Sequence, residues 1–407
     1  MSRRISYIIV LLLSAVSCRV EVSDPYAETL RSLAVSVTYP EGYESFLREG
    51  VAVSVEDINL GSAYSLALDA SGKATFRLPE GLYRVSVSDR SGADIFNATA
   101  DRFVVSGSDA TLSLSLKHTK AGTIVIKEIY CGGCLKAPEE GNYQADKYVI
   151  LHNNDVEVQY LDSLAFGYTH PYNATASNPF LDKDSEGRSV FKDYVAIADA
   201  VWMFPGDGTT FPLQPGEDAV IAINGAIDHT VSFPLSVNLD REEYFVTYNA
   251  NYFTNQTYHP VPGAHIRNDH ILECLVKTGV GNALAFSISS PAVVLYKAKG
   301  TSLEEYVAGE GVIPIPGSVA GAKVLACPLD WVLDAVEVFD GRTATNAKRF
   351  PDTLDAGYVS QSDIYLGHSL MRRTDEELSE ASGFEVLMDT NNSSADFYER
   401  ESQSLHE

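Results

Sequence analysis

The chain has 407 residues, of which 45% are hydrophobic, and its 30 basic and 55 acidic residues give a formal net charge of −25. This length accommodates two or three domains, and the hydrophobic content excludes disorder along the whole chain. Because so negative a surface repels phosphate groups, nucleic acid is excluded as a partner, and the charge is typical of a well-solvated exported protein.

The N-terminal segment has the features of a bacterial lipoprotein signal peptide. Residues 1–17 contain two arginines, then an apolar stretch that ends at Leu13, and then small residues directly before Cys18. The apolar stretch is too short to span a bilayer, which favours removal on export. We expect Cys18 to become the lipidated first residue, since several acyl chains together give stable anchoring. The alternative is a plain secretory signal in which Cys18 lies near the cleavage site by chance.

Residues 18–30 are expected to form a lipid-anchored tether. Glu21 and Asp24 make this segment acidic, and in this respect it resembles the tethers that direct some lipoproteins to the cell surface. We therefore expect an outer-membrane location with the protein on the cell surface, and the periplasmic face is the alternative.

Residues 31–118 show alternating apolar and polar side chains, which predicts strands with one buried face. The alternating runs are residues 33–37, 51–55, 64–68, 74–78, 83–87 and 112–116. Turn sequences such as 69–72 (DASG) separate them, so that together they predict a small N-terminal β-sandwich. The spacing resembles the prealbumin-like and carboxypeptidase-regulatory-like sandwiches of exported bacterial proteins, and this resemblance implies a spacer.

A polar joint at residues 117–122 (KHTKAG) places a domain boundary near residue 120, so that residues 120–407 form a second, larger domain. This part is rich in β-branched and aromatic residues and poor in long helical periodicity, which again predicts strands. Two short helices are expected, one capped by Ser302 and one that follows Thr374. The predicted fold class is therefore all-β.

With Cys18 set aside for lipid, four cysteines remain in a compartment that permits disulfides. Cys131 and Cys134 form a C-G-G-C motif, whereas Cys274 and Cys327 lie far apart in the sequence. The motif lacks the following helix of a redox pair and the second ligand pair of a zinc site. A local disulfide or two free thiols are therefore favoured for the motif over metal or redox chemistry, and the pairing of Cys274 with Cys327 is left open.

Motifs of the second domain come in an order that resembles the lamin-tail domain, an immunoglobulin-like sandwich. They are residues 123–130 (TIVIKEIY), 146–154 (DKYVILHNN), 160–164 (YLDSL), 213–222 (LQPGEDAVIA), 290–296 (SPAVVLY), 333–338 (LDAVEV) and 367–372 (GHSLMR). Together with residues 202–206 (WMFPG), 348–352 (KRFPD) and 389–392 (DTNN), they resemble an uncharacterised lipoprotein family of Bacteroides-type bacteria, known as a domain of unknown function. The resemblance implies a lamin-tail-like β domain with long insertions, and it transfers no catalytic residue.

The chain offers no recognisable catalytic or metal-binding constellation. His259, His265 and His270 form the one local concentration of histidines, but their spacing matches no ligand motif and they would not share one face of a helix or strand. No nucleophile elbow, zinc-protease motif or phosphate loop occurs. We therefore expect no catalytic residues, no metal and no cofactor.

Aromatic residues in the long insertions of the second domain are the candidate binding residues. Aromatic rings beside amides can stack on sugars or anchor a protein partner, because they bury a large area at a small cost in entropy. The candidate ligand or partner loop contains Tyr244, Tyr248, Tyr252, Tyr258, His259 and His265. The competing interpretation is that these rings form a small satellite core beneath the insertions.

These observations predict an outer-membrane lipoprotein whose N-terminal sandwich holds the larger domain away from the bilayer, for binding rather than catalysis. The expected partners are the bilayer, through the acylated N-terminus, an outer-membrane β-barrel transporter, and a glycan or small nutrient. One alternative is an envelope scaffold or adhesion protein without a small ligand. Another is an enzyme that acts on glycans or peptides.

Overall fold

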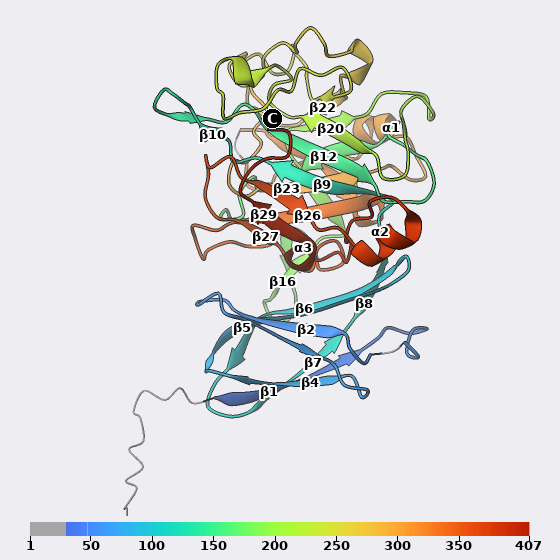
Figure 1. The fold of residues 1–407 in the computed structure, drawn as a ribbon, viewed down its shortest axis with the longest axis vertical. Helices are drawn as coiled ribbons and strands as arrows, with labels where there is room; N and C mark the ends of the chain where they lie inside the picture. Colours follow the sequence, from blue (N-terminus) through green and yellow to red (C-terminus); the bar gives the residue numbers. More distant parts are fainter. Residues whose placement is uncertain (1–29, 47, 319, 407) are drawn as a thin grey trace, which may run out of the picture.

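The computed structural model describes residues 30–46, 48–318 and 320–406. Two β-rich domains are stacked end to end, and the regular structure consists almost wholly of strands (Figure 1). The predicted all-β sandwich fold is thereby confirmed. The predicted signal peptide, the lipidation site Cys18 and most of the tether lie outside the described residues. Within the described ranges, no helix is both long and apolar enough to cross a bilayer.

The N-terminal domain is a sandwich of two sheets. The three-stranded sheet has the order β4 (Lys73–Leu78), β1 (Arg31–Thr38), β7 (Ala110–Ser115). The five-stranded sheet has the order β3 (Ala63–Ala67), β2 (Ala52–Asp57), β5 (Gly81–Ser91), β6 (Asp94–Val105), β8 (Lys117–Lys120). Alternate residues such as Leu33, Val53 and Val85 are fully buried between the sheets, as the period of two requires. All six alternating runs of the sequence coincide with strands to within one residue.

The larger domain has two six-stranded sheets at its centre. The first has the order β21 (Phe245–Val246), β20 (Asp218–Ala222), β12 (Tyr148–Asn153), β9 (Ile124–Tyr130), β28 (Ser369–Arg372), β29 (Phe397–Arg400). The second has the order β22 (Glu273–Lys277), β18 (Ala200–Met203), β14 (Ala165–Tyr168), β23 (Ala292–Tyr296), β26 (Val332–Asp340), β27 (Val359–Gln361). The main core lies between them and contains Ile126, Phe166 and Trp202, all almost completely buried. Central strands such as β12 and β23 are buried along their whole length.

A further layer and several small elements cover this sandwich. The third sheet has the order β17 (Tyr194–Ile197), β25 (Lys323–Pro328), β24 (Val312–Pro314). The two-stranded pairs are β10 (Cys134–Leu135) with β11 (Asn142–Tyr143), β13 (Gln159–Tyr160) with β19 (Pro212–Leu213), and β15 (Leu181–Lys183) with β16 (Ser189–Phe191). The helical elements are α1 (Leu303–Ala308), α2 (Glu376–Ser382), α3 (Ser393–Asp396) and the 3-10 turns η1 (His229–Val231), η2 (Asn268–His270) and η3 (Leu329–Trp331).

Both predicted helices form, with one difference at the start of α2. Ser302 caps α1, because its side chain accepts a hydrogen bond from the backbone N–H of Glu305. α2 is capped by Asp375, one residue later than the sequence indicated. Thr374 is instead bridged to Leu387, so its backbone belongs to a β contact.

The four cysteines of the described part are free thiols, which corrects the disulfide alternative. Cys131 and Cys134 have separate partners: the Cys131 thiol donates to Gln361 Oε1 at 2.8 Å, and the Cys134 thiol faces Asp146 Oδ2 at 3.6 Å. Cys274 packs against the core between the six-stranded sheets, whereas Cys327 is buried in the core beneath the third sheet. Neither pair therefore comes together, and the free-thiol alternative describes the C-G-G-C motif.

The two domains meet through polar contacts. The outer surface of the five-stranded sheet faces two segments of the larger domain, residues 355–358 and 389–394 (Figure 1). The side-chain hydrogen bonds across this boundary include Thr99 to Ala356 O at 2.9 Å, Asn391 to Thr119 at 2.7 Å and Asn392 to Ser88 at 2.9 Å. We call this contact the seam. Paired polar groups fix the geometry of the seam more than they stabilise it.

Candidate functional site

The predicted candidate loop divides into a buried and an exposed group. Tyr244 and Tyr248 pack against a satellite core on the outer face of the first six-stranded sheet. His259 is buried and stacks on Tyr248 with ring centroids 5.1 Å apart. Its Nε2 accepts a hydrogen bond from the Asn249 N–H, and burial lowers the pKa of His259 to about 4. These three residues serve the satellite core, as the competing interpretation stated.

Tyr252, Tyr258 and His265 are exposed, but they do not form one site. Tyr252 contributes its backbone carbonyl to Lys277 at 2.9 Å. The His265 ring contacts Asp240 at 2.9 Å on the surface. Tyr258 alone lines a cavity, which has a volume of about 370 Å³ and lies within the larger domain. We call this cavity the Lys147 pocket, after the single charged side chain in its lining.

The Lys147 pocket forms where two antiparallel strands share one end of the first sheet. Lys147 directly precedes β12 and Asn224 follows β20 by two residues, and the pairing of Tyr148 with Ala222 brings them to the same edge. Ile223 N donates to Lys147 O at 2.9 Å and closes this end of the ladder. The irregular segment 283–288 forms another wall.

Most polar groups of the pocket are held by neighbours. Lys147 Nζ donates to the carbonyl of Phe286 at 2.7 Å. The Tyr172 hydroxyl donates to Asp199 Oδ1 at 2.7 Å, and Asn173 Oδ1 accepts from Ser287 Oγ at 2.5 Å. Burial lowers the pKa of Lys147 to about 8, which leaves the ammonium mostly protonated at neutral pH. The pocket therefore has fixed walls and one buried cation in its lining.

Sequence reasoning identified Tyr258 and missed both Lys147 and Asn224. One signal was present: Lys147 directly precedes a run of strand residues, where its aliphatic stem has to be buried. The partnership with Asn224 depends on which strand pairs with β12, and a single sequence does not specify that pairing.

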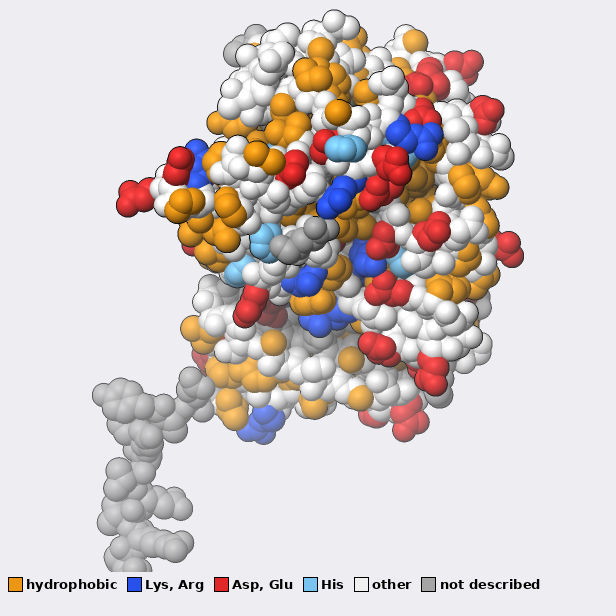
Figure 2. All heavy atoms as spheres, turned by 45° about the horizontal axis from the view of Figure 1, so that its top comes forward, with side chains coloured by type: hydrophobic (Ala, Val, Ile, Leu, Met, Phe, Trp, Pro, Cys, Tyr) orange, Lys and Arg blue, Asp and Glu red, His pale blue; other side chains and the backbone are white. Residues whose placement is uncertain are grey.

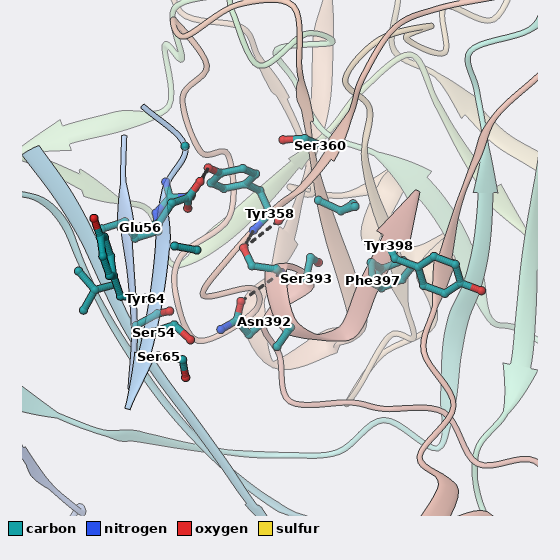
Figure 3. Close-up of a pocket in the computed structure, with 18 of the residues that line it drawn as sticks. Ser54, Glu56, Tyr64, Ser65, Tyr358, Ser360, Asn392, Ser393, Phe397 and Tyr398 are labelled. Atoms are coloured by element: carbon teal, nitrogen blue, oxygen red, sulfur yellow. Dashed lines mark hydrogen bonds and ion pairs between the residues drawn. The ribbon is translucent and has the colours of Figure 1, made fainter. Parts of the chain in front are cut away.

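A second cavity, of about 500 Å³, lies at the seam (Figure 3). The Tyr358 ring points towards the N-terminal domain, where its hydroxyl donates to Glu56 at 3.2 Å. The Arg84 guanidinium lies 4.1 Å above the centre of this ring and also pairs with Asp101 at 2.5 Å. Because Tyr358 and Arg84 connect the two domains, with only Arg84 Nη1 of this group lacking a hydrogen bond in the described structure, we assign the seam cavity to the joint between the domains.

The described residues offer little support for nucleophilic catalysis by a thiol or for metal binding. Burial raises the pKa of Cys131, Cys134 and Cys274 to about 12 and that of Cys327 further, so that all four thiols stay protonated at neutral pH. No group of three or more His, Cys, Asp or Glu side chains in the described ranges is placed to hold a metal ion. Acidic side chains are dispersed over the face seen in Figure 2, with basic side chains among them.

Comparison with known proteins matches part of the chain to a family of unknown function. Residues 214–404 match the family model described as "Protein of unknown function (DUF4876)". The matched region includes Asn224 and Tyr258 and begins after Lys147. A search of curated proteins finds no match.

Among solved structures, the chain resembles a DUF4876 family protein from Bacteroides thetaiotaomicron. The identity is 22% and the TM-score 0.57, and the match covers 90% of this chain and 94% of that chain. A DUF3823 family protein from Parabacteroides merdae is matched over 44% of this chain and 83% of that chain, at 15% identity and a TM-score of 0.18, too low to support an argument about fold. The expected Bacteroides-type family of unknown function is confirmed, and none of these matches indicates a catalytic family.

Proposed function

We propose that the chain is a surface-exposed outer-membrane lipoprotein that binds a small nutrient or a membrane-embedded transporter without catalysing a reaction. The observation that carries the proposal is the position of β1. This first described strand lies in the three-stranded sheet, whereas the five-stranded sheet faces the larger domain (Figure 1). A tether that leads into β1 therefore enters on the side of the spacer away from the larger domain.

The Lys147 pocket supports a binding role. It lies wholly in the larger domain, so an anchored spacer would carry it away from the bilayer. Its lining has the usual composition of a small-molecule site, with aromatic rings and a few fixed polar groups. The protonated thiols and the absence of a catalytic family among the matches favour binding over catalysis.

Cys18→Ala tests the anchor directly. The variant lacks the thiol that would carry the acyl chains, so we expect it to move from the outer-membrane fraction to the soluble periplasmic fraction. Cell fractionation with immunodetection measures this shift. Cys274→Ala is the matched control and should remain in the membrane fraction. Retention of Cys18→Ala in the membrane would refute the lipoprotein proposal.

A further inference from the structure

The lining of the Lys147 pocket differs in charge from the chain as a whole. The chain carries 55 acidic residues, yet the lining of this pocket contains no Asp or Glu. Lys147 is its single charged side chain and is only 5% exposed. Asp146, next to Lys147 but outside the lining, interacts electrostatically with the ammonium and offsets its burial only in part, since the pKa of Lys147 is still lowered. The remaining cost is relieved if an anion or further hydrogen-bond acceptors reach the ammonium.

Lys147 has unused hydrogen-bonding capacity. An ammonium has three N–H donors, and in the described part of the chain Nζ has one acceptor, the carbonyl of Phe286. Two donors are therefore left for a ligand. A carboxylate would accept from them strongly, because charge-assisted hydrogen bonds are stronger than neutral ones.

Asn224 supplies the complementary acceptor. This residue is 4% exposed, and its Oδ1 is buried without a hydrogen-bond partner in the described structure. Its Nδ2 donates to the carbonyls of Tyr258 at 3.2 Å and Leu284 at 3.1 Å, which fixes the amide with Oδ1 as the free atom. A buried acceptor without a partner costs about 1–3 kcal/mol. A ligand that offers a donor would recover this cost.

Two tyrosines limit the class of ligand further. Tyr172 is fixed by Asp199, and Tyr258 is 41% exposed beside the cavity. Their rings offer flat apolar surfaces against which the C–H face of a sugar can pack. An amino acid would fit less well, because its ammonium would meet Lys147 with no carboxylate in the lining to balance it.

We propose that the Lys147 pocket binds an acidic sugar of the hexuronate class, whose carboxylate accepts hydrogen bonds from Lys147 Nζ and one of whose hydroxyls donates to Asn224 Oδ1. This inference rests on the proposed binding function and names the ligand class for it. The cavity volume of about 370 Å³ lies in the range of small-ligand sites.

Calorimetric titration of the full chain in detergent tests the proposal, with D-glucuronate, D-galacturonate and D-glucose as probes at pH 7. At least one uronate should bind at least tenfold more tightly than glucose. Lys147→Met should reduce uronate affinity at least tenfold, whereas Lys323→Met, which removes an exposed lysine outside the pocket, should leave it unchanged. The proposal is overturned if neither uronate binds, if glucose binds as well, or if Lys147→Met binds normally.

A second variant guards against a folding defect in Lys147→Met. Tyr258→Ala removes an exposed ring from the lining and leaves the backbone carbonyl that Asn224 uses, so uronate affinity should fall at least fivefold while the thermal midpoint stays within a few degrees. Uronate binding by folded Tyr258→Ala equal to that of the wild type would also overturn the proposal.

The experiments test the lipoprotein proposal and the ligand-class proposal independently. If Cys18→Ala stays in the membrane but the wild type binds uronate, the lipoprotein proposal is wrong and the ligand class stands. If the anchor is confirmed and no uronate binds, only the ligand class is wrong.

Discussion

Arg372, in β28 of the first six-stranded sheet, shows how a single buried residue holds several acidic side chains together. Its guanidinium is buried and pairs with Asp334, Asp389 and Asp396, with the last two at 3.5 and 3.7 Å. One positive charge thus faces three carboxyl groups. Burial raises the pKa of Asp334 to about 6 and that of Asp396 to about 7. The cluster therefore takes up protons in the folded state in a range where the unfolded chain does not.

Because of this proton uptake, we predict that the contribution of the cluster to the free energy of unfolding falls as the pH rises from about 4 to about 7. The folded-state pKa of Asp396 lies above its unfolded value, so its contribution is fully present at low pH and is lost as the carboxyl ionises. Asp396→Asn cannot ionise at this position. Between pH 5 and pH 7.5 its unfolding free energy should therefore fall by about 1–3 kcal/mol less than that of the wild type. Urea unfolding at each pH measures this difference.

Asp193→Asn is the control, because Asp193 is exposed and should leave the wild-type pH dependence unchanged. Equal pH dependence in Asp396→Asn and wild type would show that Asp396 does not titrate in this range.

The candidate site could be predicted only in part, for reasons that also lie at the residue scale. Tyr258 was found because an aromatic residue in a polar insertion is conspicuous. Lys147 was missed because a lone lysine has no ligand motif around it. Tyr248 and His259 were grouped with Tyr258 by proximity in the sequence, but they pack inwards on the satellite core. Sequence proximity does not tell which rings of a loop face solvent.

At the scale of elements, the C-G-G-C motif shows that two glycines can be required by packing. Gly133 has φ +74°, and a Cβ at this position would collide with the backbone carbonyl of Tyr143 in the paired strand β11. A Cβ on Gly132 would press on the side-chain amide of Gln361. The motif that suggested redox or zinc chemistry therefore marks a close approach of the β10–β11 hairpin.

Gly133→Ala should consequently destabilise the larger domain by about 2–4 kcal/mol, because it adds a collision with backbone to the strain of a positive φ. Gly300→Ala is a matched control, since Gly300 has φ +79° but open space around the added Cβ. This control should lose only about 1 kcal/mol. Thermal unfolding followed by circular dichroism measures both variants, and equal losses would refute the collision argument.

The strands themselves were predictable where one face is buried. Every alternating run in the N-terminal domain became a strand, and in most of them alternate residues are buried, as the pattern indicates. The exception is β3, which has no buried residue. β6 was not predicted. Its buried set includes the polar Asn97, whose amide donates to the carbonyl of Thr390 across the seam, so contact with the second domain interrupts the period of two.

At the scale of the whole molecule, the seam decides whether the two domains behave as one body. Tyr358 is central to it, since its ring lies under Arg84 and its hydroxyl reaches Glu56, both in the N-terminal domain. Stacking on Phe339 within the larger domain holds the ring in place. Most other contacts across the seam are single hydrogen bonds between side chains and backbone. These are worth about 0.5–1.5 kcal/mol each, whereas Tyr358 combines a cation–π contact of about 0.5–2 kcal/mol with a hydrogen bond to a carboxylate in one side chain.

Tyr358→Ala should therefore uncouple the domains. We expect the wild type to unfold in one calorimetric transition, and the variant to show two, with the N-terminal domain melting first because it has the smaller core. Tyr398→Ala, which removes a partly exposed tyrosine from the rim of the seam cavity, is the control and should keep a single transition. A single transition in Tyr358→Ala would mean that the hydrogen bonds suffice for coupling.

The position of β9 has a consequence for how the chain reaches its native state. β9 begins the larger domain, yet one of its two neighbours is β28, and Arg372 Nε donates to Ile126 O across 246 residues of sequence. Until that distant segment arrives, β9 presents an open edge of unpaired backbone groups. Such long-range pairing slows folding and exposes the nascent chain to aggregation. Early pairing of β28 with β9 would thus raise the yield of folded protein.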